Sequence, residues 1–364
     1  MNNTILIRTA AALLAAVLLF PCEVHGISAK KAIVMDGETG RVLYEKEADS
    51  RSLIARTTKI MTALVVCEQC NVLDRMSIPK QAVGIEGSSM YLQEGEVLTL
   101  QELLYGMMLS SGNDAATALA IYCGGTVEGF VGLMNDKARK LGLRNTHFSN
   151  PHGLDAPDHF STARDLAMLA AYAMDNPIFA HTVAAKSVTI GKRTLTNHNK
   201  LLWQLDGADG VKTGFTKAAG RILVSSATRQ GRRVLCVTIN DGNDWQDHKT
   251  LLEAGFSRYR QTRLLECGQT VGTLAVFGGE KEWVNVIASE DFSYPLAEGE
   301  DVTLILSAKG IAYAPVVAGA DAGFVYICVD GSAVGKVPVY YYETVEQSAQ
   351  EKKPFWQRWL GDRT

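Results

Sequence analysis

The spacing of apolar positions changes along the chain, and after the helical stretch it changes near residue 209 and again near residue 264. Between residues 57 and 173 the apolar side chains recur every three or four positions, which is the period of amphipathic helices. Thr99 and Glu102 add the pattern of a capping box, a helix-start signal. The expected helices cover residues 57–68, 99–108, 115–123, 127–141 and 162–173.

Short apolar runs flank this helical stretch on both sides. Residues 31–44 contain two such runs separated by turn-forming residues, which predicts a β-hairpin. Residues 221–227 and 233–239 are two further strands joined by a turn that contains Gly231. Strands at both ends with helices between them indicate one sheet closed by distant segments, with a helical lobe against it. We therefore expect an α/β (α+β) fold.

From residue 264 onward the chain contains only short apolar runs separated by Gly, Asp and Ser turns. The expected strands cover residues 271–276, 284–288, 302–306 and 323–328. This pattern is typical of a separate all-β domain. We place it at residues 263–345, after a larger domain at residues 27–262.

Residues 1–26 have the pattern of a secretory signal. Arg8 is the only charge before Glu23, residues 10–20 are wholly apolar, and small residues follow from Gly26, where we expect the cut. An uncleaved anchor is the alternative, although the apolar run is short for a membrane span. The pattern predicts an exported protein.

Residues 346–364 differ from both predicted domains. Phe355, Trp356, Trp359 and Leu360 share one helical face, with lysines and arginines around it. An aromatic face with a basic rim suits a helix that lies in a membrane interface, so a membrane surface is an expected partner of this tail. The alternative is a tail that packs on its own β domain.

Composition and cysteine spacing argue against nucleic acid and metal as ligands. The 364 residues are 47% hydrophobic with a formal net charge of −3, which gives no basic surface for a nucleic acid. Cys67 and Cys70 lie within an apolar helical pattern, and no second Cys or His pair completes a zinc set. Six cysteines would remain after the expected cut, an even number that permits disulfides, but their spacing is scattered. We interpret Cys67 and Cys70 as buried small side chains. No metal and no cofactor are expected.

Three short segments, far apart in the sequence, carry residues suited to one acyl-transfer cleft. They are Arg56-Thr57-Thr58-Lys59, Ser111-Gly112-Asn113 and Lys212-Thr213-Gly214. In this order they resemble the S-x-x-K, S-x-N and K-T-G signature of penicillin-binding and β-lactamase-like enzymes. The segments 150–154 and 161–166 also resemble the low-molecular-mass D-alanyl-D-alanine carboxypeptidases in particular.

The resemblance covers roughly residues 28–262, and the β domain and tail are similar to the C-terminal parts of that family. It implies a β-lactamase/transpeptidase-like sheet with a helical lobe, followed by a small all-β domain. It also implies a place at the extracytoplasmic face of the cell membrane or in the cell wall. The implied partner is a peptidoglycan stem peptide that ends in D-Ala-D-Ala.

The same resemblance implies catalytic roles for the first two segments. Lys59 would take the proton of a nucleophile three residues earlier, on the same helix face. It must be neutral to do so, and burial beside other cations lowers a lysine pKa. Ser111 would relay a proton to the leaving amine, and Asn113 would hold the substrate backbone.

The third segment would bind the substrate. Lys212 would meet the terminal carboxylate, with Thr213 beside it on the strand wall. Gly214 would let the substrate approach the strand closely. The backbone N–H groups of Arg56 and Phe215 would hold the oxyanion.

The nucleophile position departs from the family pattern because Arg56, not serine, precedes Lys59 by three residues. A guanidinium cannot form an acyl ester. Thr57 and Thr58 carry hydroxyls, but a shift of one residue turns a helical side chain by about 100°. Arg56 either blocks the slot, grips a carboxylate, or reflects a one-base change from a serine codon.

Two functions therefore compete. One is a serine-type carboxypeptidase that trims peptidoglycan side chains and is impaired at Arg56. The other is a non-catalytic module that binds D-alanyl peptide ends, for which β-lactams would be weak or non-covalent ligands. A β-lactamase is a third and weaker hypothesis, because the β domain and tail argue against it. His152, His159 and His198 are expected to make structural hydrogen bonds rather than a metal site or a catalytic triad.

Overall fold

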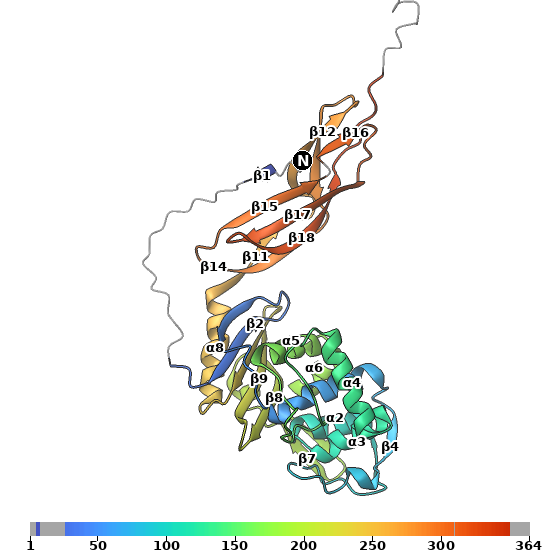
Figure 1. The fold of residues 1–364 in the computed structure, drawn as a ribbon, viewed down its shortest axis with the longest axis vertical. Coiled ribbons are helices and arrows are strands. Elements are labelled where there is room, and N and C mark those ends of the chain that lie inside the picture. Colours follow the sequence, from blue (N-terminus) through green and yellow to red (C-terminus); the bar gives the residue numbers. More distant parts are fainter. Residues whose placement is uncertain (1–4, 8–25, 309, 350–364) are drawn as a thin grey trace, which may run out of the picture. The chain divides into compact units, whose positions relative to one another are not determined.

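The computed structural model describes residues 5–7, 26–308 and 310–349. It divides into two compact units, residues 26–259 and residues 260–349 with residues 5–7 (Figure 1). The boundary thus falls slightly before the one expected after residue 262. Most of the predicted signal and tail lies outside the described residues, so both stay predictions.

The first unit is built around a five-stranded antiparallel sheet of order β3-β2-β10-β9-β8. Its strands are β2 (Lys31–Asp36), β3 (Val42–Lys46), β8 (Ala208–Thr216), β9 (Gly220–Arg229) and β10 (Arg232–Ile239). The early hairpin β2-β3 joins the sheet through β10, with Ile33 opposite Val237. The predicted closure of one sheet by distant segments is therefore observed.

Helices cover both faces of this sheet. They are η1 (Ala55–Thr58), α1 (Lys59–Gln69), η2 (Lys80–Ala82), α2 (Leu100–Leu109), α3 (Asn113–Gly124), α4 (Val127–Lys140), α5 (Ala163–Met174), α6 (Pro177–Ala184), α7 (Leu201–Gln204) and α8 (Asp244–Arg258). Short paired strands complete the unit: β4 (Arg75–Ser77) with β5 (Val97–Thr99), and β6 (Ser187–Ile190) with β7 (Arg193–Thr196).

Alternating side chains of the sheet supply two separate cores. Ile33 and Val237 face the helical lobe and join its large apolar cluster, whereas Val34 and Val234 face α8. Leu251 of α8 closes the second cluster. This alternation follows from the two-residue period of a strand, and it explains why both sides of the sheet need helices.

The helix starts follow the side-chain caps seen in the sequence. Thr99 and Glu102 form the predicted capping box at α2, and Thr162 caps α5 by accepting a hydrogen bond from the Asp165 N–H. Among the described residues no single helix has the length and hydropathy of a membrane span. Only the pair α3 and α4 passes together, with a bend of 84° between them.

One interpretation of the cysteines is wrong. Cys70 forms a disulfide with Cys123, so it is not a free buried side chain. Cys67 remains free, and burial raises the pKa of its thiol to about 12. The two bonded cysteines lie at the ends of α1 and α3, which are adjacent helices of the lobe.

The second unit contains only strands among its described residues. They are β1 (Ile5–Ile7), β11 (Tyr259–Leu265), β12 (Thr270–Phe277), β13 (Trp283–Ala288), β14 (Phe292–Ala297), β15 (Val302–Ala308), β16 (Ile311–Tyr313), β17 (Asp321–Val329) and β18 (Ser332–Tyr341). Seven form a sheet of order β1-β15-β17-β18-β13-β12-β16, and β11 pairs with β14. Its core is aliphatic, for example Val286, Val325 and Val339. We refer to this unit as the β module.

Candidate active site

Lys59 is the first residue of α1 and is completely buried. Its neighbours Ile60 and Met61 are core residues, which hold this turn in place. Lys59 Nζ lies 2.7 Å from Asn113 Oδ1 and 2.6 Å from the carbonyl oxygen of His152. Burial, and then the charges of Lys212 and Arg56, place the pKa of Lys59 well below its usual range. A neutral amine donates to both acceptors and keeps its lone pair, as a general base requires.

Ser111 and Asn113 lie between the end of α2 and the start of α3. Ser111 has a positive φ of 60°, and its buried hydroxyl has no hydrogen-bond partner among the described residues. The Asn113 amide spans two segments, because its Nδ2 also donates to the Glu86 carbonyl at 2.6 Å. Asp114 binds the backbone N–H groups of Met90 and Leu92, which fixes the loop after Glu86. This wall is therefore rigid, and one polar group on it lacks a partner.

Lys212 lies on β8, which pairs with β9 and forms the edge of the five-stranded sheet. Its side chain is 2% exposed, and Nζ donates to the Thr213 carbonyl at 3.1 Å. Burial first, and then the charge of Arg56, lower the pKa of Lys212 to about 7. The lysine is therefore only partly charged at neutral pH.

Gly214 lies where β8 passes the start of the first helix. A Cβ atom at this position would be 3.3 Å from the Thr57 nitrogen and 3.4 Å from the Arg56 nitrogen. A side chain would push the strand away, so glycine permits the close approach. The backbone nitrogen of Arg56 therefore lies close to β8 at the residue before Phe215, which is where the family resemblance predicts an oxyanion hole.

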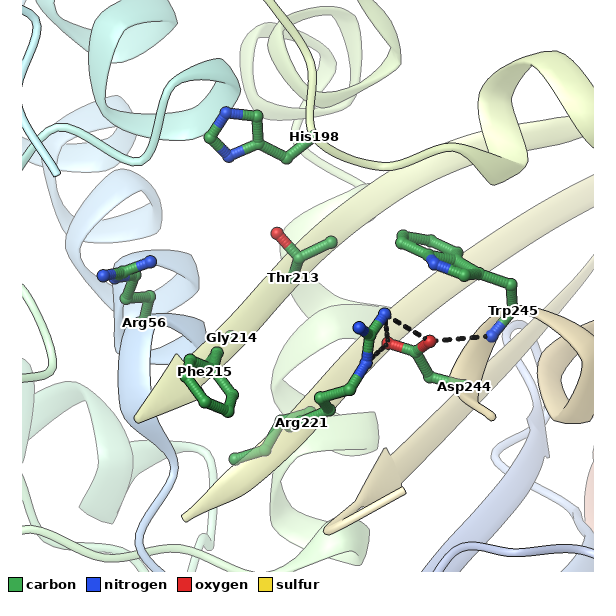
Figure 2. A pocket seen from close by; sticks show the side chains of 9 residues that line it. Arg56, His198, Thr213, Gly214, Phe215, Arg221, Asp244 and Trp245 are labelled. Atoms are coloured by element: carbon green, nitrogen blue, oxygen red, sulfur yellow. Dashed lines mark hydrogen bonds and ion pairs between the residues drawn. The ribbon is translucent and has the colours of Figure 1, made fainter. Parts of the chain in front are cut away.

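Figure 2 shows Arg56 across from Thr213 and Gly214, with His198 above them in this view. All four residues line one cavity of about 310 Å³. Within the described part of the chain, no hydrogen bond or ion pair engages the Arg56 side chain. Its Nη2 atom is 4.0 Å from the position that a Cβ of Gly87 would take, so the guanidinium reaches toward the loop that Asn113 contacts.

The two threonines after Arg56 do not offer a substitute hydroxyl. Thr57 Oγ1 donates to the Ile54 carbonyl at 2.6 Å, and Thr58 Oγ1 donates to the Ala55 carbonyl at 2.9 Å. Both side chains are fully buried. Their hydroxyls are thus committed to the turn that starts the helix.

His159 and His198 differ in the contacts that their rings make. His159 Nδ1 accepts from the Ser149 N–H, so Nε2 carries the hydrogen and donates to Thr58 Oγ1. This is the structural role that the sequence predicts. His198 departs from that prediction, because among the described residues its ring makes no hydrogen bond and instead lines the cavity. Burial, then Lys212 and Arg56, lower its pKa.

The sequence did not predict four of the cavity residues: Arg221, Ile222, Asp244 and Trp245. Arg221 is the second residue of β9 and donates to both carboxylate oxygens of Asp244 at the start of α8, at 2.7 and 2.9 Å. Figure 2 shows this pair on the side of the cavity away from Arg56. Neither residue belongs to a local motif, and only the fold brings them together.

Fold and cleft together define a serine-type acyl-transfer enzyme scaffold of the penicillin-binding class. The chain belongs to the D-alanyl-D-alanine carboxypeptidase family, whose model matches residues 20–243. A second model, described as the C-terminal domain of penicillin-binding protein 5, matches residues 259–347.

Relatives span nearly the whole chain. It is 31% identical to the D-alanyl-D-alanine carboxypeptidase DacF of Bacillus subtilis, over 92% of this chain and 90% of that protein. It is 35% identical to DacC of Escherichia coli, over 89% and 86% of the two chains. The structure of penicillin-binding protein 5 from Haemophilus influenzae aligns with a TM-score of 0.76 at 30% identity, covering 88% of this chain and 98% of that one.

Proposed function

We propose that this chain recognises D-alanyl ends of peptidoglycan stem peptides and is blocked in acyl transfer at Arg56. The observation that carries the proposal is the occupant of the nucleophile position. A guanidinium stands three residues before a buried lysine, and the two neighbouring threonine hydroxyls are already hydrogen-bonded. The contacts of Lys59 with Asn113, and the burial of Ser111 and Lys212, support the assignment of the other site residues.

The binding half of the site supports recognition of an extended peptide. β8 is an edge strand, so its free side can pair with a ligand backbone. Lys212, Thr213 and Asn113 offer a carboxylate anchor, a hydroxyl and an amide to that ligand. The Ser111 hydroxyl, which has no partner among the described residues, offers one further hydrogen bond.

We extend the proposal to the place of action. The apolar stretch at residues 10–20 supports export, and the aromatic and basic tail at residues 346–364 supports attachment to a membrane surface. Together they would hold the cleft on the extracytoplasmic side, where stem peptides are found. A vesicle flotation assay with and without residues 346–364 tests the attachment.

Labelling with a fluorescent penicillin tests whether the chain has a nucleophile in this cleft. We expect the unmodified chain to stay unlabelled, because a stable penicilloyl ester needs a serine oxygen. Arg56→Ser should become labelled and release D-alanine from a pentapeptide. The gain in turnover should be on the order of a million-fold, the usual cost of losing such a nucleophile.

Arg56→Ala is the matched control, because it removes the cation without adding a hydroxyl. It should remain unlabelled, which separates relief of a blocked slot from restoration of a nucleophile. Clear labelling of the unmodified chain would contradict the proposal, and mapping the modified residue would then identify another nucleophile.

A further inference from the structure

Lys212 is the expected anchor for a substrate carboxylate, but the cations of the cleft differ in how fully they are charged. The pKa of Lys59 lies well below its usual range, and the pKa of Lys212 is lowered to about 7 by burial and then by Arg56. Arg221 is paired with Asp244 at 2.7 Å. Among the cleft cations that the structure describes, Arg56 alone is both permanently charged and without a partner.

The position of Arg56 would bring its charge next to one particular carbon atom of a bound peptide. Residue 56 precedes Lys59 by three positions, as a nucleophile would, and its nitrogen is 3.4 Å from the position that a Cβ of Gly214 would take. The family resemblance places a side chain at this position against the carbon that a nucleophile would attack. In a D-Ala-D-Ala peptide this carbon is an uncharged amide carbonyl. In a peptide that has already lost its last residue, the same carbon is a terminal carboxylate.

We propose that Arg56 makes the cleft selective for trimmed stem peptides, which end in a single D-alanine, over peptides that end in D-Ala-D-Ala. The inference rests on the proposed function and names its preferred ligand. The guanidinium and the N–H groups of residues 56 and 215 provide a fork of donors for one carboxylate. A D-Ala-D-Ala end meets the same guanidinium with an uncharged carbonyl, and its own carboxylate reaches only the weakly charged Lys212.

The experiment compares three synthetic peptides of one stem sequence, titrated at pH 7 by calorimetry against the full chain. One ends in D-Ala-D-Ala, one in a single D-Ala, and one in a single D-Ala amide that lacks the negative charge. We expect the acid with a single D-Ala to bind about 10- to 100-fold more tightly than the other two, the usual range for a charge-assisted hydrogen bond.

Two variants assign the preference to the guanidinium. Arg56→Gln keeps a polar side chain but no charge, and it should lose that preference of about 10- to 100-fold. Its affinity for the D-Ala-D-Ala peptide should not fall, because loss of the Arg56 charge raises the pKa of Lys212 and leaves that amine more fully charged at pH 7. Arg56→Lys keeps the charge but not the planar fork, and it should retain an intermediate preference. Thermal melting of each variant confirms that the fold persists.

The outcomes separate this inference from the function it rests on. Equal or tighter binding of the D-Ala-D-Ala peptide, or an unchanged preference in Arg56→Gln, overturns the selectivity and leaves peptide recognition standing. Failure of all three peptides to bind overturns both. Binding of the single D-Ala acid and its amide with equal affinity also overturns the inference, because the carboxylate would then have no role.

Discussion

The two units of the chain differ in the polar groups that they bury. The first unit buries Lys59, Lys212 and His248 together with many other polar side chains. The β module buries no charged side chain and no histidine among its described residues, and its core is formed by residues such as Val325 and Val339. No histidine occurs in the sequence after residue 248.

The contrast shows that the buried polar groups, whose burial opposes folding, are concentrated in the first unit. Burying a lysine without a carboxylate partner opposes folding, because the charged form must be given up. The first unit tolerates this cost at Lys59 and Lys212, which are both buried. The β module carries no such cost, so its stability rests on ladder hydrogen bonds and aliphatic packing. The two units should therefore respond differently to pH and to mutation.

Acidification should separate the two units most strongly. Burial lowers the pKa of His248 to about 3 and that of His152 and His159 to about 4, against an ordinary value of 6.5. Between these values the unfolded chain binds protons that the folded chain does not, so stability falls as pH falls. Each histidine contributes up to about 1.4 kcal/mol per pH unit, several kcal/mol in all between about pH 7 and 4.5.

Hydrogen exchange read by mass spectrometry, corrected for the intrinsic pH dependence, measures this for each unit. Peptides from residues 26–259 should lose protection at about pH 4.5, whereas those from residues 260–349 should change little. His248→Gln should weaken the dependence, and the exposed His181→Gln should not. An equal loss in both units would remove the contrast.

A single methyl group added at Gly323 should lower the stability of the β module. Gly323 has φ of +131°, and a Cβ there would lie 2.4 Å from the Ser307 carbonyl oxygen in the neighbouring strand β15. Gly323→Ala combines backbone strain with overpacking, so we expect a loss of about 3 kcal/mol. Urea unfolding, followed by exchange of peptides from residues 260–349, measures it.

Gly331→Ala is the matched control, since its φ is +77° but nothing lies within 4 Å of the added atom. It should lower stability by about 1 kcal/mol, the usual cost of the positive φ alone. Similar losses for the two variants would show that the β15–β17 contact does not limit this module.

The parts of the fold that could be predicted are those with a local signal. The capping box of Thr99 and Glu102 can be identified from the sequence because it depends on two residues that are three positions apart. Helix α8 was missed because charged residues interrupt its apolar stripe. Strand β18 was missed because Gly335 and Pro338 argue against a strand interior.

The candidate site residues that could be predicted are likewise those with a local sequence signal. Lys59, Ser111 and Lys212 carry short motifs, so the family resemblance locates them from the amino-acid sequence alone. His198, Asp244 and the disulfide partner Cys123 carry no motif, because their neighbours in space are distant in sequence. The charge state of Lys212 also escaped prediction, since it depends on complete burial and on the nearby Arg56.

Removing one buried amine should give the smallest effect, and it should be stabilising. Lys212→Met replaces a side chain with a pKa of about 7 by an apolar one of similar length. It loses one hydrogen bond of 3.1 Å to the Thr213 carbonyl but no longer has to deprotonate on folding. We expect the free energy of unfolding at pH 7 to rise by about 1 kcal/mol, as when a functional polar group is replaced by a hydrophobe.

The pH dependence identifies the cause of that gain. An unfolded lysine titrates near 10.5, so the stability of the unmodified chain rises as pH increases from 7 toward that value. The advantage of Lys212→Met should therefore shrink between about pH 7 and pH 10 in urea unfolding. Lys192→Met, at an exposed turn position, should change stability by less than about 0.5 kcal/mol at either pH. If the gain in stability stays constant with pH, it comes from packing and not from removal of the buried amine. The difference between this unit and the β module would then not depend on the buried lysine.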